Sequence, residues 1–112
     1  MSLRIICDQR DGQWYARAIR EESGDPFGIE CAGTTVEEAT ARLQSWLDWQ
    51  REHTAALDAL QQAERAYHRT IAGSAFVSPA DNLSAVELQK ESLQVVEAAR
   101  VRLDEVRARK PA

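Results

Sequence analysis

Cysteine and histidine are the residue types best suited to attack a substrate or hold a metal ion, and this chain has two of each. His53 and His68 fall on one predicted helix about 22 Å apart, too far to share a metal ion within one chain. Cys7 and Cys31 could approach one another across a sheet, but two thiols without a third ligand make a poor zinc site. A cysteine nucleophile needs a nearby base, and no histidine precedes residue 53. We therefore expect no metal, no cofactor and no catalytic group, and we predict that the chain is not an enzyme.

Tryptophan side chains are the other residues that could form a binding site in this sequence. Trp46 and Trp49 are three residues apart, so they lie on neighbouring positions of one helix side. We expect them to pack in the core and at the junction with the sheet. An alternative stays open, in which a small ligand or a substrate binds between the sheet and these two rings.

Length and charge narrow the possible partners. The 112 residues carry a net charge of −4, and no segment has the basic excess that a nucleic-acid surface needs. No apolar run approaches the ~20 residues that span a bilayer, and Arg4 and Asp8 interrupt the early apolar run that a signal peptide would need. We expect a cytoplasmic protein with reduced thiols that binds neither membrane nor nucleic acid.

Residues 3–20 have the pattern of a β-hairpin. Two apolar-rich runs flank Asp11-Gly12, a dipeptide favoured in two-residue type I′ turns, and this turn predicts that Arg10 pairs with Gln13. One face then collects six mostly apolar residues, which are Leu3, Ile5, Cys7, Trp14, Ala16 and Ala18. We expect that face to receive a helix, because its two alanines leave room for close approach.

The opposite face of the hairpin is mixed, with Arg4, Ile6, Asp8, Tyr15, Arg17 and Ile19. Such a face is either solvated or an interface, since tyrosine, arginine and isoleucine together are typical of interfaces. After a loop over residues 21–26, a third strand from Phe27 to Ala32 is predicted to place Phe27, Ile29 and Cys31 on the side covered by the helix.

One uninterrupted helix is predicted from Thr34 to Gly73. Thr34, Thr35, Glu37 and Glu38 form overlapping capping boxes at its start, and Gly73 ends it. Its predicted contact seam contains eight apolar residues, which are Val36, Ala39, Leu43, Trp46, Leu57, Leu60, Tyr67 and Ile71. Four further apolar residues, Leu47, Trp49, Ala56 and Ala63, fall beside this seam and broaden the apolar stripe.

A second helix is predicted from about residue 85 to 109, after a helical turn at 79–82. Ser84 and Glu87 form the capping box at its start. Its predicted seam is Val86, Leu93, Val96, Ala99, Leu103 and Val106, with Leu88 and Val95 beside it. This helix should fold back antiparallel to the long one. A two-helix hairpin with such broad stripes favours pairing with a second copy.

Residues 3–47 resemble the N-terminal domain of HicB-type antitoxins. The resemblance rests on the Asp11-Gly12 turn, on Trp14-Tyr15 in the second strand, and on the segment from Gly33 to Ala39 that starts the helix. It implies a small sheet with one helix that binds and neutralises a small toxin ribonuclease. HicB antitoxins usually add a DNA-binding module, whereas this chain continues into a helical hairpin without basic excess.

The predicted fold is therefore α+β, with a sheet domain at 1–47 and a helical hairpin extension at 48–112. The leading functional hypothesis is a non-enzymatic protein–protein interaction module, an adaptor or regulatory subunit that forms a homodimer through the helices, the open sheet face, or both. The HicB-like antitoxin is the first alternative. The predicted interface residues are Ile6, Tyr15, Arg17, Ile19, Trp49, His53, Leu57, Leu60, Tyr67, Leu93, Val96 and Leu103.

Overall fold

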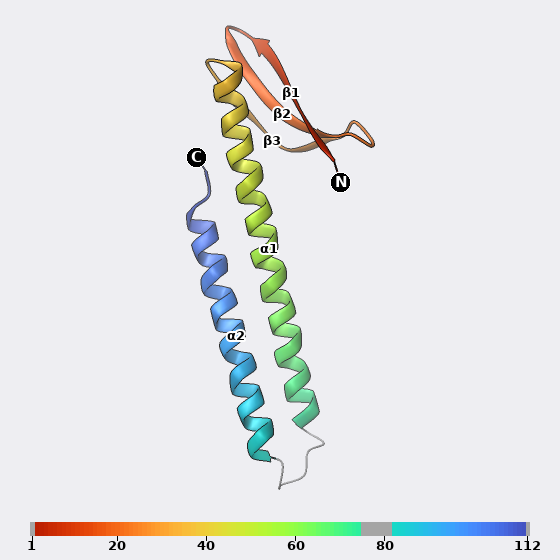
Figure 1. The fold of residues 1–112 in the computed structure, drawn as a ribbon, viewed down its shortest axis with the longest axis vertical. Coiled ribbons are helices and arrows are strands. Elements are labelled where there is room, and N and C mark those ends of the chain that lie inside the picture. The colour runs from red at the N-terminus through yellow and green to blue at the C-terminus, as the bar shows by residue number, and fades with distance from the viewer. Residues whose placement is uncertain (1, 75–81, 112) are drawn as a thin grey trace. The chain divides into compact units, whose positions relative to one another are not determined.

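The computed structural model describes residues 2–74 and 82–111. Three strands, β1 (Leu3–Arg10), β2 (Gln13–Arg20) and β3 (Pro26–Gly33), form one antiparallel sheet in the order β1-β2-β3. Two helices follow, α1 (Val36–Ser74) and α2 (Asn82–Ala108) (Figure 1). The predicted α+β class, with a long helix and a helical hairpin after a three-stranded sheet, is confirmed.

The chain divides into two compact units. We call the first the sheet unit; it contains the sheet and α1 as far as Gln50, together with Lys110. We call the second the hairpin unit; it runs from Arg51 to Arg109 and contains the rest of α1 and α2.

The Asp11-Gly12 turn sets the register of β1 and β2. Both residues have positive φ, at 52° and 79°, as a type I′ turn requires. Arg10 pairs with Gln13 and Leu3 with Arg20, so the predicted register is confirmed. This register places Ala16 and Ala18 at the centre of one face, where they are 0% and 1% exposed.

Strand β3 departs from regular alternation. Glu30 pairs with Arg17 but Phe27 pairs with Ala18, which leaves Gly28 and Ile29 as a two-residue bulge. The prediction that Ile29 shares the covered side with Phe27 and Cys31 is therefore wrong. Ile29 is 45% exposed, because the bulge removes it from the alternating pattern.

The core of the sheet unit lies between the sheet and the first turns of α1. Ala39, Leu43 and Leu47 of α1 are at most 9% exposed and pack on Ala16 and Ala18. The side chains that surround this cluster are Leu3, Ile5, Cys7, Trp14, Phe27, Cys31 and Trp46. The apolar face of the hairpin thus receives the helix, as predicted.

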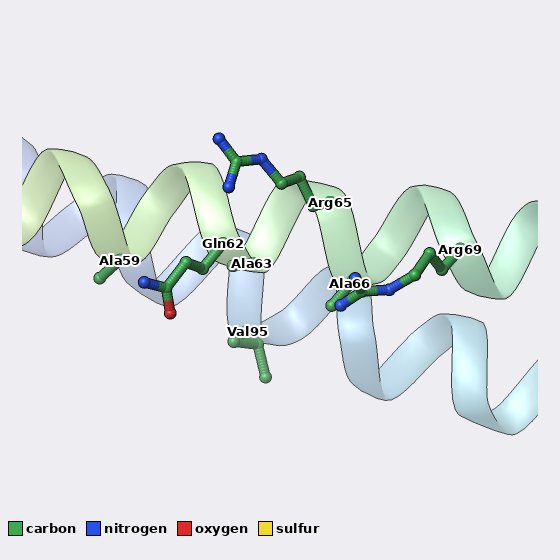
Figure 2. A pocket seen from close by; sticks show the side chains of 7 residues that line it. All are labelled: Ala59, Gln62, Ala63, Arg65, Ala66, Arg69 and Val95. Atoms are coloured by element: carbon green, nitrogen blue, oxygen red, sulfur yellow. The ribbon is translucent and has the colours of Figure 1, made fainter.

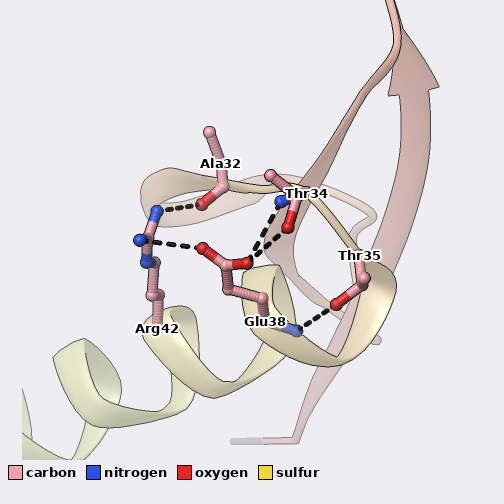
Figure 3. A network of polar contacts seen from close by, with 5 residues as sticks. All are labelled: Ala32, Thr34, Thr35, Glu38 and Arg42. Carbon is pink, nitrogen blue, oxygen red and sulfur yellow. Dashed lines mark hydrogen bonds and ion pairs between the residues drawn. The ribbon is translucent and has the colours of Figure 1, made fainter.

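A polar network fixes the start of α1 (Figure 3). The Glu38 amide donates to Thr35 Oγ1 at 3.1 Å, and Glu38 Oε2 accepts from Thr34 Oγ1 at 2.7 Å. Arg42 then joins the Glu38 carboxylate, at 2.8 Å, to the Ala32 carbonyl, also at 2.8 Å. The helix start is therefore tied to the end of β3.

In the hairpin unit, the contact seam combines alanine and serine with larger side chains. On α2 the buried and half-buried residues recur at alternating intervals of four and three, at Ala85, Gln89, Ser92, Val96, Ala99, Leu103 and Val106. On α1 the corresponding positions include His53, Ala56, Leu60, Ala63, Tyr67 and Thr70. This periodicity is that of an antiparallel coiled-coil contact.

The seam corrects several sequence predictions. Val86 and Leu93 were expected in it but are 51% and 37% exposed, and Ile71 is 44% exposed. Ala56 and Ala63 were expected beside the seam but are 6% and 7% exposed. Leu47, also expected beside it, is buried in the core of the sheet unit. The reason is helical phase, because Ala85 and Ser92 are in step with Ala99 and Val106 while Val86 and Leu93 are not.

Helix α2 begins at Asn82, earlier than the predicted start near residue 85, so Ser84 and Glu87 lie within the helix. The predicted turn at 79–82 falls, apart from Asn82, outside the described residues. At its other end α2 is held to α1 by polar contacts. Glu52 pairs with Arg109 at 3.2 Å and Arg102 at 4.0 Å, and Arg107 donates to His53 at 3.4 Å.

Candidate interaction surfaces

The uncovered face of the sheet contains four of the predicted interface residues. Ile6, Tyr15 and Ile19 are half-buried although no element covers them within the sheet unit, and Arg17 is exposed. Arg17 and Ile6 are directly paired across β1 and β2. These four side chains therefore share one face, as the alternation predicted.

Arg10 organises one end of this face, and the prediction omitted it. Its guanidinium lies 4.1 Å from the Tyr15 ring centroid and pairs with Glu30 at 2.6 Å and with Asp8 at 3.2 Å. The hydrogen bond with Glu30 raises the pKa of Arg10. Alternation along β1 was the signal that could have found Arg10, since it follows Ile6 and Asp8 at even spacing.

Both cysteines pack against the core of the sheet unit. Cys7 and Cys31 both pair with Ala16, from opposite sides, so two strand spacings of about 4.8 Å each separate them. That separation exceeds the ~7 Å between Cα atoms that a disulfide tolerates. Cys7 Sγ contacts Thr40 Oγ1 at 3.4 Å, and burial raises the pKa of the Cys31 thiol. A thiolate nucleophile is therefore disfavoured at Cys31.

The tryptophans make contacts within the sheet unit. The Trp46 ring lies against the backbone of Gly28, so closely that a Cβ there would come within 2.4 Å of Trp46 Cζ3. Trp49 has the Lys110 ammonium 5.7 Å from its ring centroid. The two rings therefore contact different parts of the unit, β3 for Trp46 and Lys110 for Trp49.

The predicted interface residues of the helices fall into two groups. Val96 and Leu103 are 2% and 4% exposed and belong to the seam of the hairpin itself. His53, Leu57, Leu60, Tyr67 and Trp49 are half-buried, while Leu93 is exposed. An interface role for these residues stays a prediction.

Helix α2 has an unusual distribution of apolar side chains. In its N-terminal half the seam toward α1 includes Ala85, Gln89 and Ser92, whereas larger apolar residues lie beside the seam. Five of these are between 37% and 58% exposed, namely Val86, Leu88, Leu93, Val95 and Val101. Val86 and Leu93 lie on one flank of the seam, and Leu88 and Val95 lie on the other.

A groove of about 470 Å³ lies between α1 and α2, and we call it the Val95 groove (Figure 2). Its lining consists of Ala59, Gln62, Ala63, Arg65, Ala66, Arg69 and Val95. Figure 2 shows Val95 extending from α2 beside the α1 segment that carries the three alanines. None of these residues was among the predicted interface set, although Ala63 and Val95 were noted as apolar residues beside the seam.

Neither helix, over its described residues, has a stretch long and apolar enough to cross a membrane. Within residues 2–74 and 82–111, no three histidine, cysteine, aspartate or glutamate side chains gather as metal ligands would. Comparison of the chain with protein-family models, curated proteins and solved structures gives no match.

Proposed function

We propose that this chain is a non-enzymatic protein–protein interaction module, an adaptor or regulatory subunit that associates through its helical hairpin. The observation that carries the proposal is the placement of side chains in the N-terminal half of α2. Small and polar residues face α1, while Val86, Leu88, Leu93 and Val95 are each at least 37% exposed. Full burial of an exposed valine or leucine contributes about 1.5–3 kcal/mol, and because about half of each of these side chains is still exposed, the remaining burial is worth about half of that and favours an associated state.

The positions of the reactive side chains also support a non-enzymatic role. Cys7 and Cys31 lie in the core of the sheet unit, separated by Ala16. His53 is in contact with Arg107, and His68 lies beside Tyr67 at the surface of α1. These residues are distributed over structural contacts rather than gathered at one site.

The test uses the full chain and a variant in which Val86, Leu88, Leu93 and Val95 are replaced by glutamine. Light scattering gives the mass in solution from low micromolar to about 100 µM, and affinity capture identifies bound proteins. We expect self-association or a captured partner with wild type, and loss of both in the variant with unchanged far-UV circular dichroism.

Ile29→Gln is the matched control, because Ile29 is an exposed apolar residue of the sheet unit, at 45%. It should leave association unchanged. A wild-type chain that stays monomeric throughout and captures no partner would contradict the proposal.

A HicB-like antitoxin is the second candidate. It is supported by the order of elements in residues 3–47, where three strands precede a capped helix as the resemblance implies. The gene beside this one should then encode a small basic ribonuclease-like protein that co-purifies with this chain. Absence of such a gene removes this candidate.

A further inference from the structure

The Val95 groove has a hollow on one helix and a ridge on the other. Ala59, Ala63 and Ala66 line it from α1, and alanine side chains leave space above the helix backbone. On α2, Leu88 and Val95 are seven residues apart, so they lie on one side of that helix two turns from each other. They are 53% and 58% exposed. One face of the hairpin therefore presents both a hollow and the side chains that would fill it.

Charges on this face are also complementary. Arg69 lines the α1 side of the groove, and Glu91 lies on α2 between Leu88 and Val95, three and four residues from each. None of the ion pairs among the described residues uses Arg69 or Glu91. The α1 rim is thus basic where the α2 rim is acidic.

Two contacts between the helices show which residues of α1 and α2 lie at the same height along the hairpin axis, which we call level with one another. Gln89 Nε2 donates to the Thr70 carbonyl, and Arg107 donates to His53. Glu91 is therefore close to level with Arg69, and Val95 is close to level with Arg65. In a dimer whose two-fold axis runs parallel to the helices, every residue of the second copy keeps its height along the hairpin axis. If the two copies face one another across that axis, α2 of the second copy lies along α1 of the first.

We propose that the Val95 groove is the interface of a homodimer, in which α2 of a second copy lies along α1. Val95 of each copy packs beside Ala66 of the other, and Glu91 of each copy faces Arg69 of the other. Both contacts occur twice, as a two-fold interface requires. The inference rests on the proposed function and names its partner as a second copy of this chain.

The area of this face is adequate for a stable dimer. The α1 segment from Arg51 to Ser74 is about 36 Å long, and two packed helices are about 20 Å wide. Their face therefore offers about 700 Å² per copy, close to the ~800 Å² of a standard interface.

The first test compares two valines of α2 with nearly equal exposure. Val95 is 58% exposed and lines the groove, whereas Val101 is 56% exposed and, six residues on, lies on a different side of the helix. Val95→Asp should weaken dimerisation of the full chain by about 100-fold, because each dimer loses two buried contacts and desolvates two carboxylates. Val101→Asp should leave it unchanged, and both variants should keep the helical circular dichroism of wild type.

Equal dimerisation of the two variants would overturn the inference, and so would a monomeric wild type. A monomeric wild type that captures another protein, and loses it with Val95→Asp, would overturn the second copy as occupant while leaving the proposed function standing. A monomer without any captured partner would overturn both.

The second test reverses the charges. Arg69→Glu and Glu91→Arg should each weaken dimerisation by about 10-fold at low salt, since every homodimer then holds two like-charged pairs. A mixture of the two variants should recover wild-type dimerisation, because a heterodimer restores both pairs. Glu97→Arg on another side of α2 is the control and should have no effect. Failure of the mixture to recover would exclude the proposed pairing of α1 with α2 of the second copy.

Discussion

Gly28 combines a left-handed backbone conformation with close packing against a side chain. Its φ is +80°, and a Cβ would lie 2.4 Å and 2.8 Å from Cζ3 and Cη2 of the Trp46 ring. The Gly28→Ala substitution should therefore cost about 1–2 kcal/mol for the left-handed backbone. Overpacking against the ring adds about 1–3 kcal/mol. The total expected loss in the free energy of unfolding is about 2–5 kcal/mol.

Urea unfolding followed by tryptophan fluorescence measures this loss selectively. Trp14, Trp46 and Trp49 all belong to the sheet unit, so their emission reports on that unit, while far-UV circular dichroism reports mainly on the helices. Linear extrapolation of the fluorescence transition gives the free energy of unfolding.

Gly24→Ala separates the two contributions. Gly24 has a nearly equal φ of +76°, but nothing lies within 4 Å of its Cβ position. Gly24→Ala should lower the free energy of unfolding only by the cost of the left-handed backbone, about 1–2 kcal/mol. A Trp46→Leu background should reduce the cost of Gly28→Ala to that same value. Equal costs for Gly24→Ala and Gly28→Ala in the wild-type background would refute the role assigned to the Trp46 contact.

Three further predictions concern the junction between β3 and α1. Gly33→Ala should cost about 1–3 kcal/mol by fluorescence-detected unfolding, because its Cβ would come within 2.6 Å of the rigid Ala39 backbone nitrogen; a neutral effect would contradict that packing. Thr35→Ala removes the acceptor of the Glu38 amide and should cost about 1 kcal/mol, whereas Thr35→Ser should restore most of it. Hydrogen bonds from Thr34 lower the pKa of Glu38 below its ordinary 4.5, so its ionised form stabilises the fold above that pH and this contribution disappears as pH falls through the lowered pKa. The stability difference between wild type and Glu38→Gln should accordingly shrink on acidification, and a difference that is constant with pH would contradict the assignment.

Local chemistry made the hairpin and the helix start predictable. Asp11-Gly12 specifies a turn with two positive φ angles, and that turn fixes the pairing of every residue in β1 and β2. Thr35 and Glu38 are a start signal read within one helical turn. In both cases the determinant lies within a few residues of the feature.

The bulge in β3 was not predictable, because nothing near Gly28 in the sequence specifies a break in alternation. In the bulged conformation, a Cβ at Gly28 would come within 2.4 Å of the ring of Trp46, a residue of α1. Ile29 leaves the covered face at this bulge. A glycine within a strand pattern is the sequence signal that allows a bulge without requiring one.

The seam of α2 was only half predictable. Val96, Leu103 and Val106 are apolar and buried, so the C-terminal half was identified from the pattern. In the N-terminal half, two sets of positions one residue apart could form the seam, Ala85 with Ser92 or Val86 with Leu93. The sequence favours Val86 and Leu93, because their side chains are larger and apolar. The structure buries the stripe with Ala85 and Ser92 instead, in phase with the C-terminal half. Continuity of helix phase outweighs side-chain size in a contact between only two helices.

This choice of stripe also explains which candidate surfaces were missed. Leu93 was predicted at the interface as part of the seam, whereas Leu88 and Val95 were treated as residues beside it. With the seam in its observed phase, Val95 lines the groove with Ala63 and Ala66, and Leu88 is exposed on the same side of α2. The groove itself requires knowledge of which α1 and α2 residues are level, and only the folded hairpin supplies it.

The mass of the full chain in solution tests the central claim of association through the hairpin most directly. Sedimentation equilibrium from low micromolar to about 100 µM should give a mass that rises from 12.6 kDa toward about twice that value. The Val95→Asp variant should remain at 12.6 kDa over the same range. A wild-type mass of 12.6 kDa at every concentration, equal to that of the variant, would contradict self-association through the Val95 groove.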